Sequence, residues 1–261
     1  MKNSILSALL LCFGFLIINP AFAQELTAQQ AWKQLVGERN FKRKAKAFEY
    51  VANDPSLPNV LIYGDSISLG YTPIVRRQLL KKANVYRLHC NGGHSASFIS
   101  KMDLMMQTMT DSKLKDPWTF KWNIIIFNVG LHDLKYLDGK KLDTEKGTQV
   151  NTPKVYSQNL QKIITYLQET QPQARLGYVL TTPVPKDSKG RKAGDAVIYN
   201  QAAMEVLKSY PNVKVADMYA LIFPNHDKWM QSPGNVHYNT KGIKQQGHFI
   251  TGIIHSMLVV K

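Results

Sequence analysis

The sequence predicts an α/β protein, a three-layer α/β/α sandwich around a central, mostly parallel five-stranded sheet. Five short apolar runs have the length and composition of buried strands, at 59–63, 84–90, 122–129, 174–181 and 213–217. Segments with helical spacing of apolar residues follow them, at 70–82, 98–110, 154–170, 196–209 and 240–258. Strands that alternate with helices form βαβ units, in which neighbouring strands are parallel. No Pro-, Gly- or Ser-rich linker divides the chain, so we expect a single folded domain after the N-terminal segments.

The first 23 residues have the pattern of an export signal. Lys2 precedes an apolar run over 5–18, and Ala-Phe-Ala at 21–23 is a small-x-small cleavage site. The apolar run is shorter than the roughly 20 residues that a membrane helix needs. We therefore expect cleavage near Ala23, a secreted or periplasmic product and no stable membrane insertion. Residues 24–55 would then form an N-terminal helical extension, and residues 56–261 the main domain.

The chain is strongly basic, with 33 lysines and arginines against 18 aspartates and glutamates and a formal net charge of +15. An exported basic protein favours polyanionic partners such as acidic polysaccharides. No nucleic-acid recognition motif accompanies the charge, so we expect no nucleic-acid partner. One basic cluster consists of Lys42, Arg43, Lys44 and Lys46. It has two interpretations, a solvated helix face or a docking patch for an anionic polymer.

Three polar segments follow successive strands, and each would be ordinary by itself. They are Gly-Asp-Ser at 64–66, Asn-Gly-Gly at 91–93 and Gly-Leu-His-Asp at 130–133. Parallel sheets bind ligands beyond the carboxyl ends of their strands, so we expect these segments to meet at one rim. Acyl transfer needs a hydroxyl nucleophile, a base and N–H donors aimed at the developing oxyanion. The segments offer all of these except the base, which His237 in SPGNVHYNTKG would supply.

The order of these segments resembles that of the SGNH (GDSL-type) hydrolase superfamily, over nearly all of 58–258. The resemblance implies a flavodoxin-like fold and a serine hydrolase that needs no cofactor. Ser66 matches the nucleophile of the family, and His237 matches its catalytic base. The oxyanion hole would then consist of the backbone N–H groups of Ser66 and Gly93 and the side chain of His132.

Two positions depart from the family pattern. The third block is normally Gly-x-Asn-Asp, and here His132 replaces the asparagine, which resembles a subgroup with Gly-Leu-His-Asp. A neutral imidazole N–H donates to an oxyanion only in the correct tautomer. The last block is normally Asp-x-x-His, but Gly234 stands where the triad carboxylate belongs. We expect a backbone carbonyl of 232–235 to accept the Nδ1–H of His237, giving a slow enzyme that favours mildly alkaline pH.

Further residues have supporting positions in these blocks: Asp65, Gly92, Asp133 and Asn235. Gly92 is the alternative oxyanion glycine, and the neutral amide of Asn235 would stabilise an imidazolium only weakly. His89 and His94 flank Cys90, but no spacing in the chain matches a zinc motif, so no metal site is expected. Signal cleavage would leave Cys90 without a disulfide partner, because it removes the other cysteine.

These features predict an exported serine esterase that hydrolyses O-acyl esters, above all O-acetyl esters on carbohydrate, through an acyl-enzyme intermediate. The substrate would be a small molecule or a polysaccharide, and a polyanionic one would suit the charge. Two alternatives stay open. A lysophospholipase or thioesterase would need an apolar acyl cleft, for which the methionine-rich segment 98–110 is the candidate. A glycan-binding relative that has lost catalysis would explain the missing carboxylate.

Overall fold

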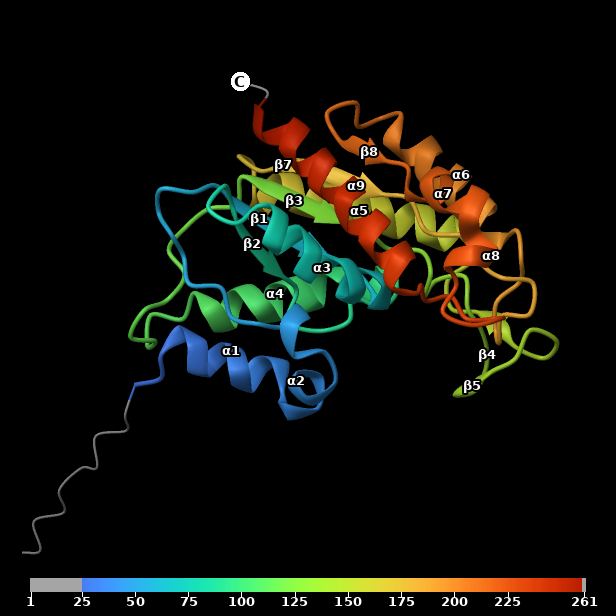
Figure 1. The fold of residues 1–261 in the computed structure, drawn as a ribbon, viewed down its shortest axis with the longest axis horizontal. Coiled ribbons are helices and arrows are strands. Elements are labelled where there is room, and N and C mark those ends of the chain that lie inside the picture. The colour runs from blue at the N-terminus through green and yellow to red at the C-terminus, as the bar shows by residue number, and fades with distance from the viewer. Residues whose placement is uncertain (1–24, 260–261) are drawn as a thin grey trace, which may run out of the picture.

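A five-stranded parallel sheet lies at the centre of the structure (Figure 1), a computed structural model that describes residues 25–259. Its strands are β1 (Asn59–Tyr63), β2 (Asn84–Arg87), β3 (Ile124–Phe127), β7 (Arg175–Val179) and β8 (Lys214–Ala216). The strand order is β2-β1-β3-β7-β8, and every neighbouring pair is parallel. This confirms the predicted fold class. The predicted export signal at 1–23 lies outside the described residues.

Helices cover both faces of this sheet. On one face lie α3 (Ser66–Gln78) and α9 (Thr240–Val259), and on the other lie α4 (Phe98–Met109), α5 (Pro153–Thr170) and α6 (Asp195–Leu207) (Figure 1). Successive side chains of a strand point to opposite faces, which the middle of β7 illustrates. Gly177 lies beside Met257 of α9, whereas Tyr178 hydrogen-bonds Tyr156 of α5.

Burial on both faces explains why continuous apolar runs, and not alternating ones, predicted these strands. All five residues of β1 and all four residues of β3 are buried. The carboxyl ends of β1 and β3 therefore lie side by side within a rigid, fully covered part of the sheet. The segments that follow these strands are therefore held in fixed positions at the edge of the sheet.

The helix after β1 begins earlier than the sequence predicts, at Ser66 instead of residue 70, and ends at 78 instead of 82. Asp65 is its N-cap, and the carboxylate accepts a backbone N–H of the first turn at 2.8 Å. Ser-Ile-Ser-Leu-Gly is a weak helix-forming sequence, so the cap sets the start where propensity does not. Beyond the end of the helix, Lys81 has a φ of 60°, a left-handed conformation that an α-helix does not accept.

Several short elements were not predicted. A second, antiparallel sheet has the order β5-β4-β6 and consists of β4 (Tyr136–Asp138), β5 (Lys141–Leu142) and β6 (Thr148–Gln149). Three helical turns connect β8 to α9, namely α7 (Met218–Ile222), η3 (Phe223–Asn225) and α8 (His226–Trp229), and η2 (Ser95–Ser97) precedes α4. Each of these elements is too short to show a periodic pattern of apolar residues.

The N-terminal extension is helical, with α1 (Ala28–Val36), α2 (Glu38–Lys44) and the 3₁₀ turn η1 (Ala45–Ala47). α1 packs against α4, and η1 packs against α3. The Trp32 indole N–H donates to the Phe48 carbonyl at 2.8 Å, and the Arg76 guanidinium donates to the Lys46 carbonyl at 2.9 Å. These contacts fix the extension on the main domain. Within residues 25–259, none of the helices combines the length and the apolar character that crossing a membrane requires.

Candidate active site

Ser66 stands at the turn between β1 and α3. The strand ends at Tyr63, Gly64 follows, and Asp65 caps the helix of which Ser66 is the first residue. Gly64 has no room for a side chain, because a Cβ there would lie 2.9 Å from the side chain of Ser68. The first N–H groups of a helix have no partner within it. The turn therefore presents both the hydroxyl and the backbone N–H of Ser66 at the rim of the sheet.

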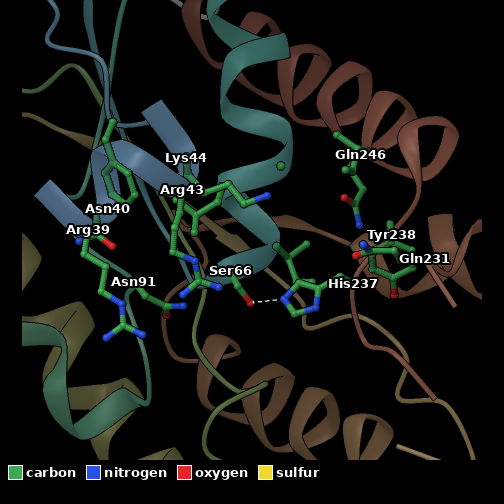
Figure 2. Close-up of a pocket in the computed structure, with 15 residues that line it drawn as sticks. Arg39, Asn40, Arg43, Lys44, Ser66, Asn91, Gln231, His237, Tyr238 and Gln246 are labelled. Atoms are coloured by element: carbon green, nitrogen blue, oxygen red, sulfur yellow. Dashed lines mark hydrogen bonds between the residues drawn. The ribbon is translucent and has the colours of Figure 1, made fainter. Parts of the chain in front are cut away.

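His237 reaches Ser66 from the segment before α9. Met230 and Tyr238 pair as an antiparallel bridge, and the backbone N–H of Gln231 donates to the carbonyl of His237 at 2.9 Å. These bonds hold the imidazole over the start of α3, where Nε2 lies 2.9 Å from Ser66 Oγ (Figure 2). The structure thus brings together the two residues predicted as nucleophile and base.

The partner of the other ring nitrogen of His237 is a side chain, so the expectation of a backbone carbonyl was wrong. Asn235 Oδ1 lies 2.8 Å from His237 Nδ1 and also accepts the backbone N–H of His237 at 2.9 Å. The backbone N–H identifies this amide atom as the oxygen, so Nδ1 carries the proton and Nε2 accepts from Ser66. Within residues 25–259, no carboxylate forms an ion pair with His237. The arrangement is a Ser-His dyad oriented by a neutral amide.

The backbone at Gly234 explains why no carboxylate occupies the family position. Gly234 has a φ of 71°, in the left-handed region that favours glycine. A Cβ at this position would lie 2.6 Å from the backbone oxygen of Asp187. An aspartate at 234 would be both strained and blocked. The partner for His237 instead comes from the next residue along the chain, Asn235.

The surroundings of His237 keep its imidazole neutral. Burial lowers the pKa of His237 below its usual value, and the positive charges of Arg191, Lys44 and Lys135 lower this pKa further. A neutral imidazole is the form that accepts a proton from a serine hydroxyl. His237 could therefore act as a base at neutral pH, although no carboxylate in the described structure pairs with it to stabilise an imidazolium.

The Asn-Gly-Gly segment is held against the turn that carries Ser66. The backbone N–H of Gly92 donates to the Gly64 carbonyl at 3.0 Å, and a Cβ at Gly92 would lie 2.9 Å from that same oxygen. Lys101 Nζ donates to the carbonyls of Asn91 and Gly92, each at 2.9 Å. Gly93 has a φ of 70° and donates its N–H to the side-chain oxygen of Asn91 at 2.9 Å. The predicted oxyanion donor is thus occupied by Asn91, which a substrate oxyanion would have to displace.

Lys135 selects the tautomer of His132. Its Nζ lies 2.9 Å from His132 Nδ1, and because an ammonium only donates, Nδ1 accepts and Nε2 bears the proton. Burial, together with the charges of Lys135 and Arg191, lowers the pKa of His132 to about 3, so the ring is neutral. A neutral ring with an Nε2–H is the form that the predicted oxyanion role requires. Lys135 and Arg191 also lower the pKa of His237, so both imidazoles lie in one cationic environment.

The two predicted supporting aspartates brace the site and form no ion pair with His237. Asp133 is buried, and its carboxylate accepts the backbone N–H of Ser95 at 3.0 Å and the amide of Asn151 at 2.7 Å. These bonds tie the third block to η2, whereas Asp65 caps α3. Burial raises the pKa of both carboxyls. Across residues 25–259, no three His, Cys, Asp or Glu side chains gather as a metal site would require.

Ser66 and His237 lie in a pocket of about 620 Å³. Figure 2 shows a wall from α2 on one side of the dyad and residues of the 231–238 segment and α9 on the other. Four of the side chains that line the pocket are apolar, namely Phe48, Ile67, Leu69 and Ile243. The remaining lining is polar or glycine, and it includes Arg39, Asn40, Arg43 and Lys44 of α2.

One polar residue of the lining, Gln246, has unusual surroundings. Its side chain is fully buried, and neither its Oε1 nor its Nε2 has a hydrogen-bond partner in the described structure. Nothing in the sequence singles out Gln246 among the residues of the final helix. Arg43 and Lys44 belong to the basic cluster noticed in the sequence, but only the folded extension shows that these two residues border the dyad. Arg39 and Gln246 reach the site through tertiary contacts, and no local sequence pattern would have assigned either residue to it.

Comparisons with known proteins found one matching family and several similar folds. The model of the GDSL-like lipase/acylhydrolase family matches residues 62–244. No curated protein matches the chain. Among solved structures, the lipase/acylhydrolase from Enterococcus faecalis is similar with a TM-score of 0.58 at 15% identity, covering 76% of this chain and 96% of that one. The acetyl xylan esterase AlAXEase is similar with a TM-score of 0.55 at 15% identity, covering 77% and 100%.

A third similar structure is a carbohydrate esterase family 2 enzyme with a carbohydrate-binding domain from Corynascus thermopiles (Myceliophthora fergusii). Its TM-score is 0.55 at 16% identity, covering 80% of this chain and 68% of that one. At such low identity these structures establish the shared fold. The family model, in contrast, spans the segments that contain Ser66, Gly93, His132 and His237. The chain therefore belongs to the GDSL-like lipase/acylhydrolase family of ester-hydrolysing enzymes.

Proposed function

We propose that this protein is an exported serine esterase that removes O-acyl groups, above all O-acetyl groups, from carbohydrate. The observation that carries the proposal is the contact of 2.9 Å between Ser66 Oγ and His237 Nε2, in a pocket that is lined by both polar and apolar side chains. An intact dyad argues against a relative that binds glycans without catalysis, because binding alone would not require this hydrogen bond.

In the proposed mechanism, His237 Nε2 takes the proton of Ser66 as Oγ attacks the ester carbonyl. The oxyanion accepts hydrogen bonds from the backbone N–H of Ser66, from Nε2–H of His132 and from the backbone N–H of Gly93, where it displaces the side-chain oxygen of Asn91. His237 then protonates the alkoxide, which departs as an alcohol. The acyl group stays on Ser66 as an acyl-enzyme. Water activated by His237 releases the acyl group as a carboxylic acid and restores the serine.

The lining of the pocket favours a sugar ester over a long-chain lipid ester. A lipid hydrolase needs an apolar channel for the acyl chain, and segment 98–110 was the candidate. In the structure, Phe98, Met102, Met105 and Met109 are all fully buried core residues and do not line the pocket. The unpartnered amide of Gln246 is a group that a sugar hydroxyl would satisfy. Two similar folds are an acetyl xylan esterase and a carbohydrate esterase, which is compatible with this substrate class.

Export is part of the proposal and is supported by the pattern of residues 1–23. It predicts a mature protein that begins at Gln24 and is found outside the cytoplasm. Mass spectrometry of the protein isolated from its native host would identify this N-terminus. An unprocessed chain in the cytoplasm would contradict export and leave the hydrolase assignment untouched.

The hydrolase proposal is tested with purified protein on 4-nitrophenyl esters of increasing chain length and on acetylated sugars. We expect turnover of acetyl esters that falls as the acyl chain lengthens. Ser66→Ala should abolish turnover without changing the fold, whereas Ser100→Ala, an exposed serine of α4 outside the pocket, should keep it. A preference for long acyl chains would favour the lipid hydrolase. Absence of any turnover by the wild-type protein would favour the glycan-binding alternative.

A further inference from the structure

The face of α2 that borders the active-site pocket is cationic. Arg39, Asn40, Arg43 and Lys44 line the pocket together with Ser66 and His237. Figure 2 shows the side chains of Arg39, Arg43 and Lys44 grouped on the same side of the dyad. Positions i and i+4 of a helix lie on one face, so Arg39 and Arg43 form one row.

The charges of α2 are separated between its faces. Its one acidic residue, Glu38, pairs with Lys42 at 3.3 Å, and neither residue lines the pocket. Within the described part of the chain, Arg39, Arg43 and Lys44 form no ion pair. The cations on the pocket side of α2 therefore have no carboxylate partner, and no aspartate or glutamate is part of the pocket lining.

This arrangement has a cost that a ligand would offset. Two like charges at i and i+4 destabilise a helix, and in α2 Phe41 alone packs against the core, where it is only partly buried. The helix is nevertheless held in place by its flanks. Phe48 is buried, its ring lies 5.0 Å from the Arg87 guanidinium carbon, and its carbonyl accepts the Trp32 indole N–H. An anion between Arg39 and Arg43 would remove the repulsion.

We propose that Arg39 and Arg43 form a subsite for the carboxylate of an acidic sugar residue, next to the acyl ester that Ser66 attacks. This inference rests on the proposed function and specifies its substrate class, an O-acylated acidic glycan. A planar guanidinium recognises a carboxylate through two parallel hydrogen bonds, which makes arginine better suited to this role than lysine. Lys44 adds positive charge at the same wall, and its charge reaches His237.

The same cations would also attract a phosphate, so an experiment has to distinguish a sugar carboxylate from the phosphate of a lipid headgroup. A sugar carboxylate suits the pocket better than a phospholipid headgroup, because no apolar channel continues from the dyad through segment 98–110. The opposite side of the pocket carries Gln231 and the unpartnered amide of Gln246, which would serve sugar hydroxyls. The structure therefore offers anion donors on one side and hydroxyl partners on the other.

The test compares two monoacetylated probes that differ in one group, methyl glucuronoside and methyl glucoside with the acetyl group on the same hydroxyl. We expect the wild-type kcat/KM to be about 10- to 100-fold higher for the acidic probe, the range that charge-assisted hydrogen bonds support. Raising the salt concentration should reduce this ratio by screening. In Arg39→Gln/Arg43→Gln the ratio should fall towards one.

The matched control is Lys42→Gln/Lys46→Gln, which removes the same charge from the same segment outside the pocket lining. It should keep the wild-type ratio. Equal ratios in the control and in the arginine variant would overturn the subsite, because the effect would then be long-range attraction. Arg43→Lys keeps the charge but loses the planar guanidinium and its two parallel hydrogen bonds, so we expect an intermediate ratio.

A binding measurement separates failure of the subsite from failure of the proposed function. Ser66→Ala protein should bind unacetylated methyl glucuronoside more tightly than methyl glucoside in a calorimetric titration, whether or not the enzyme turns over esters. Equal binding of the two sugars would overturn the subsite even if esters are hydrolysed. Turnover of lysophosphatidylglycerol that depends on Arg39 and Arg43, with no selectivity between the sugar probes, would overturn the sugar carboxylate and assign the site to a phosphate. Selective binding without Ser66-dependent ester hydrolysis would retain the subsite and reject the esterase.

Discussion

Asn235 Oδ1 accepts two hydrogen bonds from His237, one from the backbone N–H at 2.9 Å and one from ring Nδ1 at 2.8 Å. The first bond fixes the amide as an acceptor, and the second fixes the imidazole with Nε2 towards Ser66. One neutral side chain therefore sets both the tautomer and the orientation of the base. It supplies little of the charge stabilisation that an aspartate would give to an imidazolium.

Replacement of Asn235 by aspartate should raise kcat, because a charged acceptor stabilises the developing imidazolium more than an amide oxygen does. Charge-assisted hydrogen bonds are roughly twice as strong as neutral ones, which corresponds to a gain of about tenfold. The carboxylate should also raise the pKa of His237, so the acid limb of the pH profile should move to higher pH. Steady-state kinetics between pH 4 and pH 9 measures both effects.

Asn235→Ala is the matched loss of function, because it removes the acceptor and frees the ring to change tautomer. We expect kcat to fall by about 10- to 100-fold with a smaller change in KM, in line with one lost hydrogen bond to a charged group. If Asn235→Asp and Asn235→Ala were equally impaired, Asn235 would not orient His237 during catalysis.

Lys135 should act on catalysis through the tautomer of His132. Lys135→Met removes the donor to Nδ1 and lets the proton move there, which deprives the oxyanion of the Nε2–H. We expect a kcat loss smaller than the about 10²- to 10³-fold typical of removing an oxyanion donor. His132→Asn should retain partial activity because the amide also donates, and His132→Ala should retain much less. Nitrogen-15 NMR of the imidazole in wild type and Lys135→Met reads the tautomer directly, and an unchanged spectrum with unchanged kcat would contradict this role.

The pH profile should be bell-shaped with its maximum near neutrality. His237 must be neutral to act as the base, and burial together with nearby cations lowers its pKa, so activity should already be present below pH 6.5. Burial and the charge of Arg191 lower the pKa of Lys135 to about 8. Above that pH the amine no longer enforces the His132 tautomer, so kcat should decline. Lys135→Met should lack this alkaline limb. A wild-type profile that rises steadily through pH 9 would contradict this assignment.

This expectation replaces the mildly alkaline optimum that the sequence alone favoured. The missing aspartate at Gly234 was visible in the sequence, and it argued for a poorly stabilised base. The charges of Lys44, Lys135 and Arg191 come from three separate segments, and their convergence on His237 depends on tertiary structure. Sequence reasoning therefore placed His237 beside Ser66 and missed the groups that tune the pKa of His237.

The sheet and the blocks at its rim could be predicted because each leaves a local pattern. The apolar runs of β1 and β3 are continuous, and Gly64, Gly92 and Gly93 mark places where the backbone approaches closely or has a positive φ. The wall formed by α2 could not be predicted, because a basic helix has the same sequence whether it faces solvent or a pocket. Asn235 was named from the sequence as a supporting residue, but the choice between its amide and a backbone carbonyl could not be predicted, since a carbonyl of the same segment would satisfy the same nitrogen.

The last prediction concerns the stability of the turn that carries Ser66, and it rests on Arg87. This fully buried guanidinium donates to the carbonyls of Gly64 and Asp65 at 3.0 and 3.2 Å and to Ser68 Oγ at 3.0 Å. It also donates to the carbonyls of Leu88 and Cys90, which follow β2, at 2.8 and 2.7 Å. Burial lowers the pKa of Arg87 to about 10, so the group stays charged at neutral pH and joins the turn after β1 to the segment after β2.

Arg87→Met should keep much of the volume and remove every one of these donors. The Gly64 and Asp65 carbonyls keep another donor each, so the carbonyls of Leu88 and Cys90 are the ones left without a partner. Each carbonyl left unsatisfied costs about 1–3 kcal/mol, so we expect the free energy of unfolding to fall by at least about 2 kcal/mol. Arg77→Met, on the exposed side of α3, is the control and should change it by no more than about 0.5 kcal/mol. Urea denaturation measures both variants, and Arg87→Lys should fall between them because an ammonium replaces only some of the bonds. A loss below about 1 kcal/mol in Arg87→Met would mean that other donors or water satisfy these carbonyls, and the turn would not depend on Arg87.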